Sequence, residues 1–397
     1  TTSSDEAMDA VGQMRKLAND QCFISGMTGV VTDIKNLALK ELPVYVVIAA
    51  LLSLVVLELT SGSFVVPILF LISIGLAILY NLGSNIFLGE TSYITKALTA
   101  VLQLGVTMDY SIFLWHSYQE QKERFDGDKN RAMAHAISNT ITSVVSSSIT
   151  TVAGFIALCF MSFTLGKDLG IVMAKGVVFG VIGCVTILPS LILVCDKAIE
   201  KTRHKVILPD LSRIAGFITK HHVVFVIAFL VVLIPAIYGY THTNVYYDLT
   251  GTLPETFSSK VGNDKLSEQY HMGATHMVLA KSSLSEKDSM NMIDEIKKVD
   301  GVKLAVSMDS LTGPMVPQDV IPDDVKDIFK SGDYQMMVIV SEYASATDEV
   351  NKQCDEINAI IKKYDNTAML IGEAPCTKDL IEITLSLIHI SEPTRPE

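Results

Sequence analysis

The chain has 397 residues, of which 49% are hydrophobic and 19% charged, and its formal net charge at pH 7 is −12. Soluble globular proteins carry about 25% charged residues, so this composition indicates a chain that lies partly in a membrane. The acidic balance gives no reason to expect a nucleic-acid partner, because binding to phosphates needs a basic surface.

Residues 1–38 are interpreted as the end of a soluble domain, because their pattern returns later in the chain. The stretch SDEAMDAVGQMRKLANDQCFISG (4–26) aligns in order and spacing with TDEVNKQCDEINAIIKKYDNTAMLIG (347–372). Each copy begins with a hydroxyl residue and Asp-Glu, a helix N-cap signature, and ends in a short apolar strand and glycine. An acidic and an aliphatic residue follow each copy, at Asp33 and Ile34 and at Asp379 and Leu380. We therefore predict one structural unit used twice, a soluble domain followed by a helix bundle.

Six apolar stretches are long enough, or nearly so, to cross a bilayer, which needs about 20 residues. They are residues 43–59, 64–82, 97–118, 141–163, 169–195 and 223–240. The last stretch is short enough to be a buried core helix, but beside the other five it is predicted to be a span. The sequence thus predicts a transmembrane bundle of five spans over 39–195, a cytoplasmic linker over 196–221 and a sixth span over 222–242. The given sequence starts at Thr1, and no signal peptide is expected within it before these stretches.

The third span, ALTAVLQLGVTMDYSIFLWHSY (97–118), carries one acidic residue, Asp109, near its centre. A carboxylate at that depth costs at least about 2.5–3.5 kcal/mol on insertion scales, and burial disfavours its charged form. Asp109 could therefore carry a proton between the two sides of the membrane, or it could only bind a neighbouring helix. Gly105, one turn earlier, would let another helix approach, and Tyr110 adds a hydroxyl to a proton path.

The fourth span contains ITSVVSSSITTVAGF (141–155), in which small polar residues recur at helical spacing. They are Ser143, Ser147, Thr150, Thr151 and Gly154. Such residues often serve only close packing. Their hydroxyls could also support a buried carboxyl group or a file of water molecules.

Lys175 is the other charged residue inside a span. It lies near enough to the outer end to extend outward to the polar region, and an ion pair with Asp109 is the alternative. Gly176 and Gly180 form a GxxxG pattern, which is typical of close helix packing but frequent by chance.

Lysine and arginine in the short loops predict the orientation, because cytoplasmic loops are enriched in them. Residues 117–131 and 196–220 hold ten, namely Lys122, Arg124, Lys129, Arg131, Lys197, Lys201, Arg203, Lys205, Arg213 and Lys220. The alternate loops, 81–96 and 162–168, hold two. We therefore expect the first pair of loops to be cytoplasmic and the soluble region after the sixth span to be outside.

Residues 243–384 are predicted to form that soluble region. Apolar strands are expected at 274–281, 302–308, 334–343 and 367–372, with helices at 285–299 and 346–364 and a short helix at 322–330. The order β-α-β-β-α-β is the ferredoxin-like arrangement. The last residues, 385–397, are interpreted as an artefact, because LSLIHISEPTR (385–395) resembles a translated sequencing adapter. The natural chain is expected to continue past Thr384.

Three motifs together resemble the MMPL family of the RND transporter superfamily. They are GVTMDY (105–110) before a basic loop, SSSITTVAGFIAL (146–158) and GVVFGVIGCVTILPSLILV (176–194). The stretch YYDLTGTLPETF (246–257) resembles the start of the family's second porter domain. The resemblance covers residues 4–384. It implies twelve spans in two halves and two extracytoplasmic porter domains, with residues 1–38 as the end of the first and 243–384 as most of the second.

The resemblance also implies a function. Family members export lipids or other hydrophobic and amphiphilic molecules across the bacterial cytoplasmic (plasma) membrane, using the proton gradient. Asp109 and Tyr110 correspond to the family's proton-relay pair, with Gly105, Ser147, Thr150 and Thr151 as supporting residues. The expected partners are the lipid bilayer, protons, a hydrophobic or lipid substrate and the missing second half, whose relay residues would lie beyond Thr384.

Two other functions remain open at this stage: a sterol-sensing-like module that binds lipid to regulate, and an accessory to protein translocation. An enzyme is not expected, because no nucleophile with a base and no phosphate-binding loop is present, and a Walker A motif is absent too. The six cysteines have no spacing typical of a metal site or a disulfide framework, so no metal or cofactor is expected.

Overall fold

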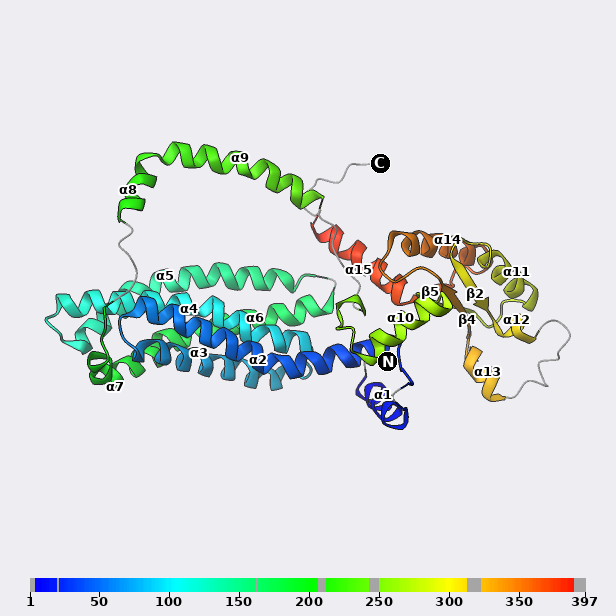
Figure 1. The fold of residues 1–397 in the computed structure, drawn as a ribbon, viewed down its shortest axis with the longest axis horizontal. Coiled ribbons are helices and arrows are strands. Elements are labelled where there is room, and N and C mark those ends of the chain that lie inside the picture. Colours follow the sequence, from blue (N-terminus) through cyan, green and yellow to red (C-terminus); the bar gives the residue numbers. More distant parts are fainter. Residues whose placement is uncertain are drawn as a thin grey trace. The chain divides into compact units, whose positions relative to one another are not determined.

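The computed structural model describes residues 4–19, 21–161, 163–205, 212–242, 250–312 and 323–388. The chain divides into two compact units. Unit 1 comprises Thr1–Lys35 and Asn244–Glu397, and unit 2 comprises Asn36–Thr243. Figure 1 shows unit 2 as long helices and unit 1 as a sheet with helices around it.

Most helices of unit 2 are long and apolar. The helices of this unit are α2 (Met27–Ser61), which begins in unit 1, α3 (Val65–Gly83), α4 (Tyr93–Arg124), α5 (Lys129–Leu158), α6 (Thr164–Ile182), α7 (Leu188–Lys201), α8 (Ser212–Lys220) and α9 (His222–Thr241). A 3-10 turn, Ser84–Leu88, extends α3, and a π-helical turn, Gly183–Ile187, joins α6 to α7. Among the described residues, six segments are helices long and apolar enough to cross a membrane, which confirms the six predicted spans as such helices.

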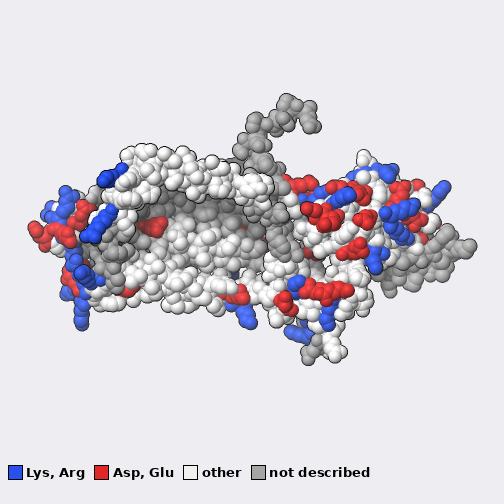
Figure 2. All heavy atoms as spheres, turned by 45° about the horizontal axis from the view of Figure 1, so that its top comes forward, with Lys and Arg blue, Asp and Glu red and all other residues white. Residues whose placement is uncertain are grey.

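Charged side chains avoid these helices along most of their length. Figure 2 shows the visible surface of unit 2 as nearly free of Lys, Arg, Asp and Glu between its ends, whereas both signs of charge cover unit 1. The helices nevertheless run past the apolar stretches: the predicted linker over 196–221 includes the end of α7 and all of α8. The helices are longer than the predicted spans because hydropathy marks only where the hydrocarbon region ends. Lys and Glu are good helix formers, so the helix continues past that point.

The core of unit 2 lies among α3, α4, α5, α6 and α7, which pack against one another. Its fully buried members include Phe70 on α3, Leu114 and Tyr118 on α4, and Leu188 and Ile192 on α7. In contrast, α9 has no buried side chain in the part of it that the structure describes. The first of the spans, α2, is 35 residues long and contains Pro43.

In the described part of unit 1, the sheet has five strands, β1 (Thr275–Lys281), β2 (Val302–Val306), β3 (Lys330–Ser331), β4 (Tyr334–Ser341) and β5 (Met369–Gly372). Their order is β2-β4-β1-β5, with β3 beside β4, and every pairing is antiparallel. Buried and exposed residues alternate along β1, as expected for a strand with one covered face. That face bears Val278 and Ala280, which pack in one cluster with Ile293 and Ile357.

The two residues Ile293 and Ile357 belong to α11 (Glu286–Ile296) and α14 (Asp348–Tyr364), which cover the sheet. The other helices of unit 1 are α1 (Asp5–Leu17), α10 (Ser258–Tyr270), α12 (Met308–Thr312), α13 (Asp323–Phe329) and α15 (Glu373–Ile388), with a 3-10 turn at Thr250–Thr252. The predicted N-caps are confirmed: Ser4 accepts from the amide of Ala7, and Thr347 accepts from that of Val350.

One predicted strand is absent. The apolar residues that precede Gly26 were expected to be extended and paired, like β5 in the second copy of the repeat. Residues 22–25 have no regular secondary structure. A strand needs a neighbour to bond its amides and carbonyls, and among the described residues none pairs with this segment. Composition alone could not reveal that difference between the two copies.

A buried histidine makes the stability of the sheet sensitive to pH. His276 on β1 is 0% exposed, and its Nε2 lies 3.3 Å from Oε1 of Gln353. Burial lowers the pKa of His276, and its bond to Gln353 only partly offsets this. The unfolded chain therefore takes up the proton first, and stability falls as pH drops below about 6.5, the unfolded pKa.

We accordingly expect amide hydrogen exchange in β1 to accelerate between pH 7 and pH 5, after correction for intrinsic rates. His276→Gln should reduce this acceleration, because the side chain no longer titrates. His271→Asn provides the control, since His271 is exposed and its left-handed backbone (φ 53°) suits Asn. An unchanged pH dependence in His276→Gln would rule out His276 as the source.

Candidate functional site

The helix α4 has two faces of opposite character. One face is exposed and consists of residues three or four positions apart, Leu98, Leu102, Gly105, Asp109, Phe113 and His116. The other is buried and carries a polar series with a period of four, Thr95, Thr99, Gln103 and Thr107. Asp109, the predicted proton carrier, lies on the exposed face.

The Asp109 side chain is open to its surroundings. No hydrogen bond or ion pair joins its carboxylate to another of the described residues, and a Cβ placed on Gly105 would meet nothing within 4 Å. The expectation that Gly105 admits a neighbouring helix is thus not met within the described part of the chain. Ionisable side chains inside membranes almost always face protein or a water-filled cavity. In the membrane, this face of α4 is therefore expected to meet protein or water and not hydrocarbon.

Tyr110 has different surroundings. Its side chain is 4% exposed and belongs to the apolar core of unit 2, together with Leu114 and Trp115. Adjacent residues on a helix are about 100° apart, so Asp109 and Tyr110 do not share a face. The structure therefore places the two members of the predicted pair in two environments, one open and one packed.

The predicted supporting hydroxyls bond within their own helix. On α5, Thr150 Oγ1 and Thr151 Oγ1 donate to the carbonyl oxygen of Ser147, at 2.7 and 3.1 Å. Ser147 and Thr150 are exposed, and Thr151 is half-buried. None of the three is bonded to Asp109 within the described residues. The hydroxyls of Thr150 and Thr151 thus bond to a backbone carbonyl one turn earlier in the same helix, which is common for Ser and Thr.

A buried polar cluster, which the sequence reasoning missed, joins α3, α4 and α6. Asn81 Nδ2 donates to Oε1 of Gln103 at 2.9 Å and to the carbonyl oxygen of Val172 at 3.1 Å. Gln103 Nε2 donates to the carbonyl oxygen of Gly176 at 3.0 Å. Both side chains are fully buried. The period-four repeat of Thr95, Thr99, Gln103 and Thr107 was the sequence signal for this face.

Lys175 also belongs to this polar cluster, and among the described residues it forms no ion pair with Asp109. Its Nζ donates to the carbonyl oxygen of Asn81 at 2.9 Å and to Oδ1 of Asn85 at 2.5 Å. Asn81 lies in the last turn of α3, and its carbonyl oxygen also accepts a hydrogen bond from the hydroxyl of Ser84 at 2.9 Å. The alternative of an ion pair with Asp109 is absent from the described residues, because the ammonium group binds this helix end instead.

The GxxxG pair of α6 lies where α6 packs tightly against side chains of α3 and α4. A Cβ on Gly176 would lie 2.6 Å from Nδ2 of Asn81 and 2.9 Å from Oε1 of Gln103. A Cβ on Gly180 would overlap the side chain of Thr107. The pattern was ambiguous in the sequence, and in the structure both glycines are packing residues that leave room for the polar face of α4.

Alanine substitution should separate these glycines from Gly105. We expect Gly180→Ala to destabilise the bundle by about 1–3 kcal/mol, the usual cost of overpacking. Gly105→Ala is the matched control, because it adds the same methyl group where no atom lies within 4 Å. Unfolding of the chain in mixed micelles with increasing dodecyl sulfate would measure the difference. Equal unfolding midpoints for the two variants would contradict the packing role of Gly180.

The first turns of α2 are fixed by a buried ion pair within unit 1. Arg15 Nη1 and Nη2 donate to Oδ1 and Oδ2 of Asp33 at 2.5 and 2.9 Å. Ser259, at the start of α10, donates to the same carboxylate from its hydroxyl at 2.5 Å. Asp33 is only 4% exposed. The sequence repeat singled out Asp33, and the structure shows that this carboxylate ties together α1, α2 and α10.

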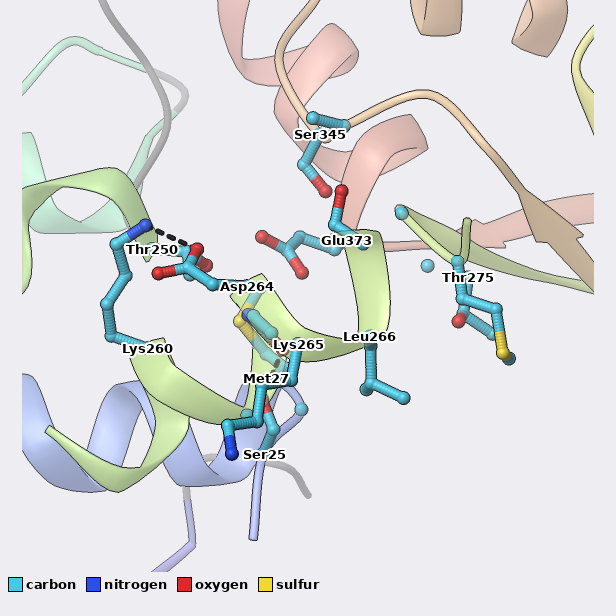
Figure 3. Close-up of a pocket in the computed structure, with 18 of the residues that line it drawn as sticks. Ser25, Met27, Thr250, Lys260, Asp264, Lys265, Leu266, Thr275, Ser345 and Glu373 are labelled. Carbon is cyan, nitrogen blue, oxygen red and sulfur yellow. Dashed lines mark hydrogen bonds and ion pairs between the residues drawn. The ribbon is translucent and has the colours of Figure 1, made fainter. Parts of the chain in front are cut away.

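Unit 1 also contains a cleft of about 910 Å³. Figure 3 shows residues from several elements around it: Asp264, Lys265 and Leu266 on α10, Thr275 on β1, and Glu373 at the start of α15. Lys260 and Asp264 form an ion pair of 2.6 Å at its edge. Apolar side chains, Met27, Met272 and Met277, line it as well. Its size is that of a small-molecule site, and its lining suits a ligand with apolar and polar parts.

Comparisons with known proteins agree with this architecture. Residues 1–220 match the family model described as MMPL family. The Streptomyces coelicolor protein named "Putative membrane protein SCO5905" is 25% identical over 93% of this chain and 45% of its own length. The Mycobacterium tuberculosis protein named "Probable transport protein MmpL12" is 24% identical over 64% of this chain and 23% of its own.

A Methanocaldococcus jannaschii protein, "Putative membrane protein MJ1562", is 34% identical over 29% of this chain and 27% of its own length. The chain thus spans less than half the length of each of these relatives. With six helices able to cross a bilayer and relatives named as membrane proteins, it is a multi-pass membrane protein.

Proposed function

The chain belongs to the MMPL family, and from this premise we propose that it is part of a secondary transporter that uses the proton gradient to export lipids or other amphiphilic molecules. Asp109 supports the proposal most directly. It is an acidic residue near the middle of an exposed, mostly apolar face of a helix long and apolar enough to span a membrane, without a bonding partner among the described residues. The relative from Mycobacterium tuberculosis, which is named as a transport protein, supports the same class of activity.

The two faces of α4 suit this role. Hydrogen bonds of Gln103 hold the buried face to α3 and α6, which keeps the backbone of α4 in place. The open face leaves the Asp109 carboxylate free to meet water or a facing helix. In our proposal, Asp109 takes up a proton from one side, becomes neutral and releases the proton on the other. Tyr110, in the packed core, would position this part of α4.

The cleft of unit 1 supports an amphiphilic cargo. Its methionines offer flexible apolar contact, and Lys265 and Glu373 offer charge for a polar head group. The strand order of the sheet fits the ferredoxin-like arrangement expected for a porter domain. We further propose that the full-length protein has twelve spans and two porter domains and lies in a bacterial cytoplasmic membrane. Residues 243–384 would then be extracytoplasmic, and further sequence would carry the second set of relay residues.

Transport can be tested in vesicles that contain the full-length protein and a fluorescent phosphatidylglycerol as probe. Dithionite, which reduces only outward-facing probe, reports movement between the leaflets. We expect movement to follow an imposed proton gradient and to stop when an ionophore dissipates it. Probe movement that does not depend on the gradient would contradict a proton-driven exporter. Tight binding of the probe without any probe movement would also contradict it and would favour a lipid-binding regulator.

Topology is testable with the same protein. We expect cysteines introduced at positions 129 and 201 to react only from the cytoplasm, and one at 297 only from outside. The exposed native residues Cys22 and Cys376 would first be changed to Ser. A membrane-impermeant maleimide applied to intact cells distinguishes the two sides. Labelling at 201 and not at 297 in intact cells would mean that the orientation is reversed.

A further inference from the structure

The turn between α2 and α3 is bonded to the end of α7. Gly62 in this turn has a positive φ of 71°, which glycine adopts without strain. Ser63 pairs with Arg203 in an isolated antiparallel bridge, and the amide of His204 donates to the carbonyl oxygen of Gly62 at 3.0 Å. The hydroxyl of Ser63 donates to the carbonyl oxygen of Ile199 at 3.2 Å. Backbone and hydroxyl bonds thus join two segments that are far apart in the sequence.

The side chain of His204 completes this contact. Its Nε2 lies 2.6 Å from Oε1 of Glu58 on α2, and its Nδ1 lies 3.0 Å from the carbonyl oxygen of Lys205. The side chains of His204 and Glu58 are only 20% and 21% exposed. The ring of Phe64, just before α3, lies beside the imidazole, with ring centres 4.7 Å apart. The imidazole is therefore held by a carboxylate, a carbonyl group and an aromatic ring.

The two acceptors decide which protonation state of His204 fits this place. A carboxylate oxygen and a carbonyl oxygen can only accept, so each bond needs an N–H from the ring. Neutral imidazole has one N–H and imidazolium has two, so only the protonated ring can donate to both. The bond to the carbonyl of Lys205 raises the pKa of His204, burial partly opposes this, and Glu58 adds to the increase. The contact is complete only when His204 carries its second proton.

The charged groups around His204 leave Glu58 as its partner. Glu58 is the charged group that α2 presents to the imidazole, whereas α3 contributes only the Phe64 ring. The acid that precedes His204 on α7, Glu200, binds Lys122 at 2.9 Å. The neighbouring cations of its own segment are exposed, namely Lys201, Arg203 and Lys205. Among the described residues, loss of the proton from His204 therefore weakens one specific contact, that between the ends of α2 and α7.

We propose that His204 and Glu58 form a pH-sensitive latch, which holds the end of α2 to the end of α7 when the imidazole is protonated and loosens when it is neutral. Because folding raises the pKa of His204, the latch contributes fully to stability below about 6.5, the unfolded pKa. Its contribution is lost as the pH rises through the higher folded pKa.

The latch would report the pH on one side of the membrane. In the topology proposed above, the end of α7 is cytoplasmic, so His204 would respond to cytoplasmic pH. The contact between His204 and Glu58 requires neither export nor the relay residue Asp109. A failure of the latch and a failure of the proposed transport are therefore separate results.

Native-state hydrogen exchange of the full chain in lipid nanodiscs tests the latch. The amide of residue 204 is the reporter, because its bond to Gly62 breaks when the two ends separate. We expect its protection, corrected for intrinsic rates, to fall as the pH rises from 6 to 8.5, by up to about tenfold for each pH unit between 6.5 and the folded pKa. His204→Gln should abolish this pH dependence, because the new side chain does not titrate. Glu58→Gln should weaken it, because the imidazolium then loses its anion.

His222→Gln is the matched control. His222 is exposed, and its Nδ1 lies 2.9 Å from the carbonyl oxygen of Thr219, with no carboxylate partner among the described residues. This change should leave the pH dependence at residue 204 unaltered. Equal protection at pH 6 and pH 8.5 in the unmodified chain would overturn the proposal, and so would a pH dependence that survives in His204→Gln. Should His204→Gln fail to fold, an undiminished pH dependence in Glu58→Gln would overturn it alone.

Discussion

Asp109→Asn is expected to abolish gradient-driven export by the full-length protein while leaving its folding and its binding of cargo intact. The amide has nearly the same size as the carboxyl group but cannot take up or release a proton. Folding should not suffer, because Asp109 has no bonded partner among the described residues, and a neutral amide is less costly to bury than a carboxylate. Flux should fall to that of vesicles without protein, measured as gradient-driven probe movement.

Glu123→Gln is the matched control, because it removes an exposed carboxyl group near the end of the same helix. It should transport at the unmodified rate. Export at the normal rate by a well-folded Asp109→Asn protein would refute the relay role. Loss of the folded protein in Asp109→Asn would instead show that the carboxylate holds helices together. Tyr110→Phe should cause a milder loss, since the ring keeps its place in the core and water can replace one hydroxyl.

The second large effect is expected from Arg15→Ala in unit 1. This change leaves the buried carboxylate of Asp33 without its bidentate partner, and breaking one side of a buried ion pair usually costs about 3–5 kcal/mol. Ser259 still donates to Asp33 but cannot neutralise it. We expect the amides of α10 to exchange much faster, because α10 is held to α2 through Ser259. Native-state hydrogen exchange of α10 gives the loss of opening free energy directly.

Lys35→Gln provides the comparison. Lys35 binds Asp5 at 2.9 Å, but Asp5 is largely exposed, so solvent screens this pair and it should contribute little to stability. Arg15→Met combined with Asp33→Leu should cost less than the sum of the two single changes, since no unpaired charge remains. If Arg15→Ala lowers the opening free energy of α10 as little as Lys35→Gln does, the pair of Arg15 and Asp33 does not stabilise unit 1.

The helices and the sheet were predictable because their signals are local. A span is recognised by summing the hydropathy of consecutive residues, and β1 by its short run of apolar residues, Met277 to Ala280. The N-caps at Ser4 and Thr347 were predictable for the same reason, since the cap and the amide it binds are three positions apart. Each of these predictions needs only a short window of the chain.

The partners of the polar residues were not predictable in this way. Lys175 binds Asn81 and Asn85, some 90 positions earlier, and this choice depends on where α3 ends beside α6. The cluster around Gln103 needs both the period-four series on α4 and two glycines on α6. Whether Asp109 faces protein or lipid depends on elements outside the described residues. Contacts between distant segments depend on how the helices pack, and a short window of the sequence does not contain that information.

The length of α2 has a mechanical consequence. At about 1.5 Å per residue, its 35 residues form a rod of about 52 Å. One end is clamped by Arg15 and Ser259 through Asp33, and the apolar remainder belongs to the membrane. Pro43 has no amide hydrogen to donate to the carbonyl of Leu39. The helix therefore bends most easily in the turn from Leu39 to Pro43, just before its apolar part. Bending of α2 is therefore concentrated at this turn, and the hinge is built into the backbone of the helix itself.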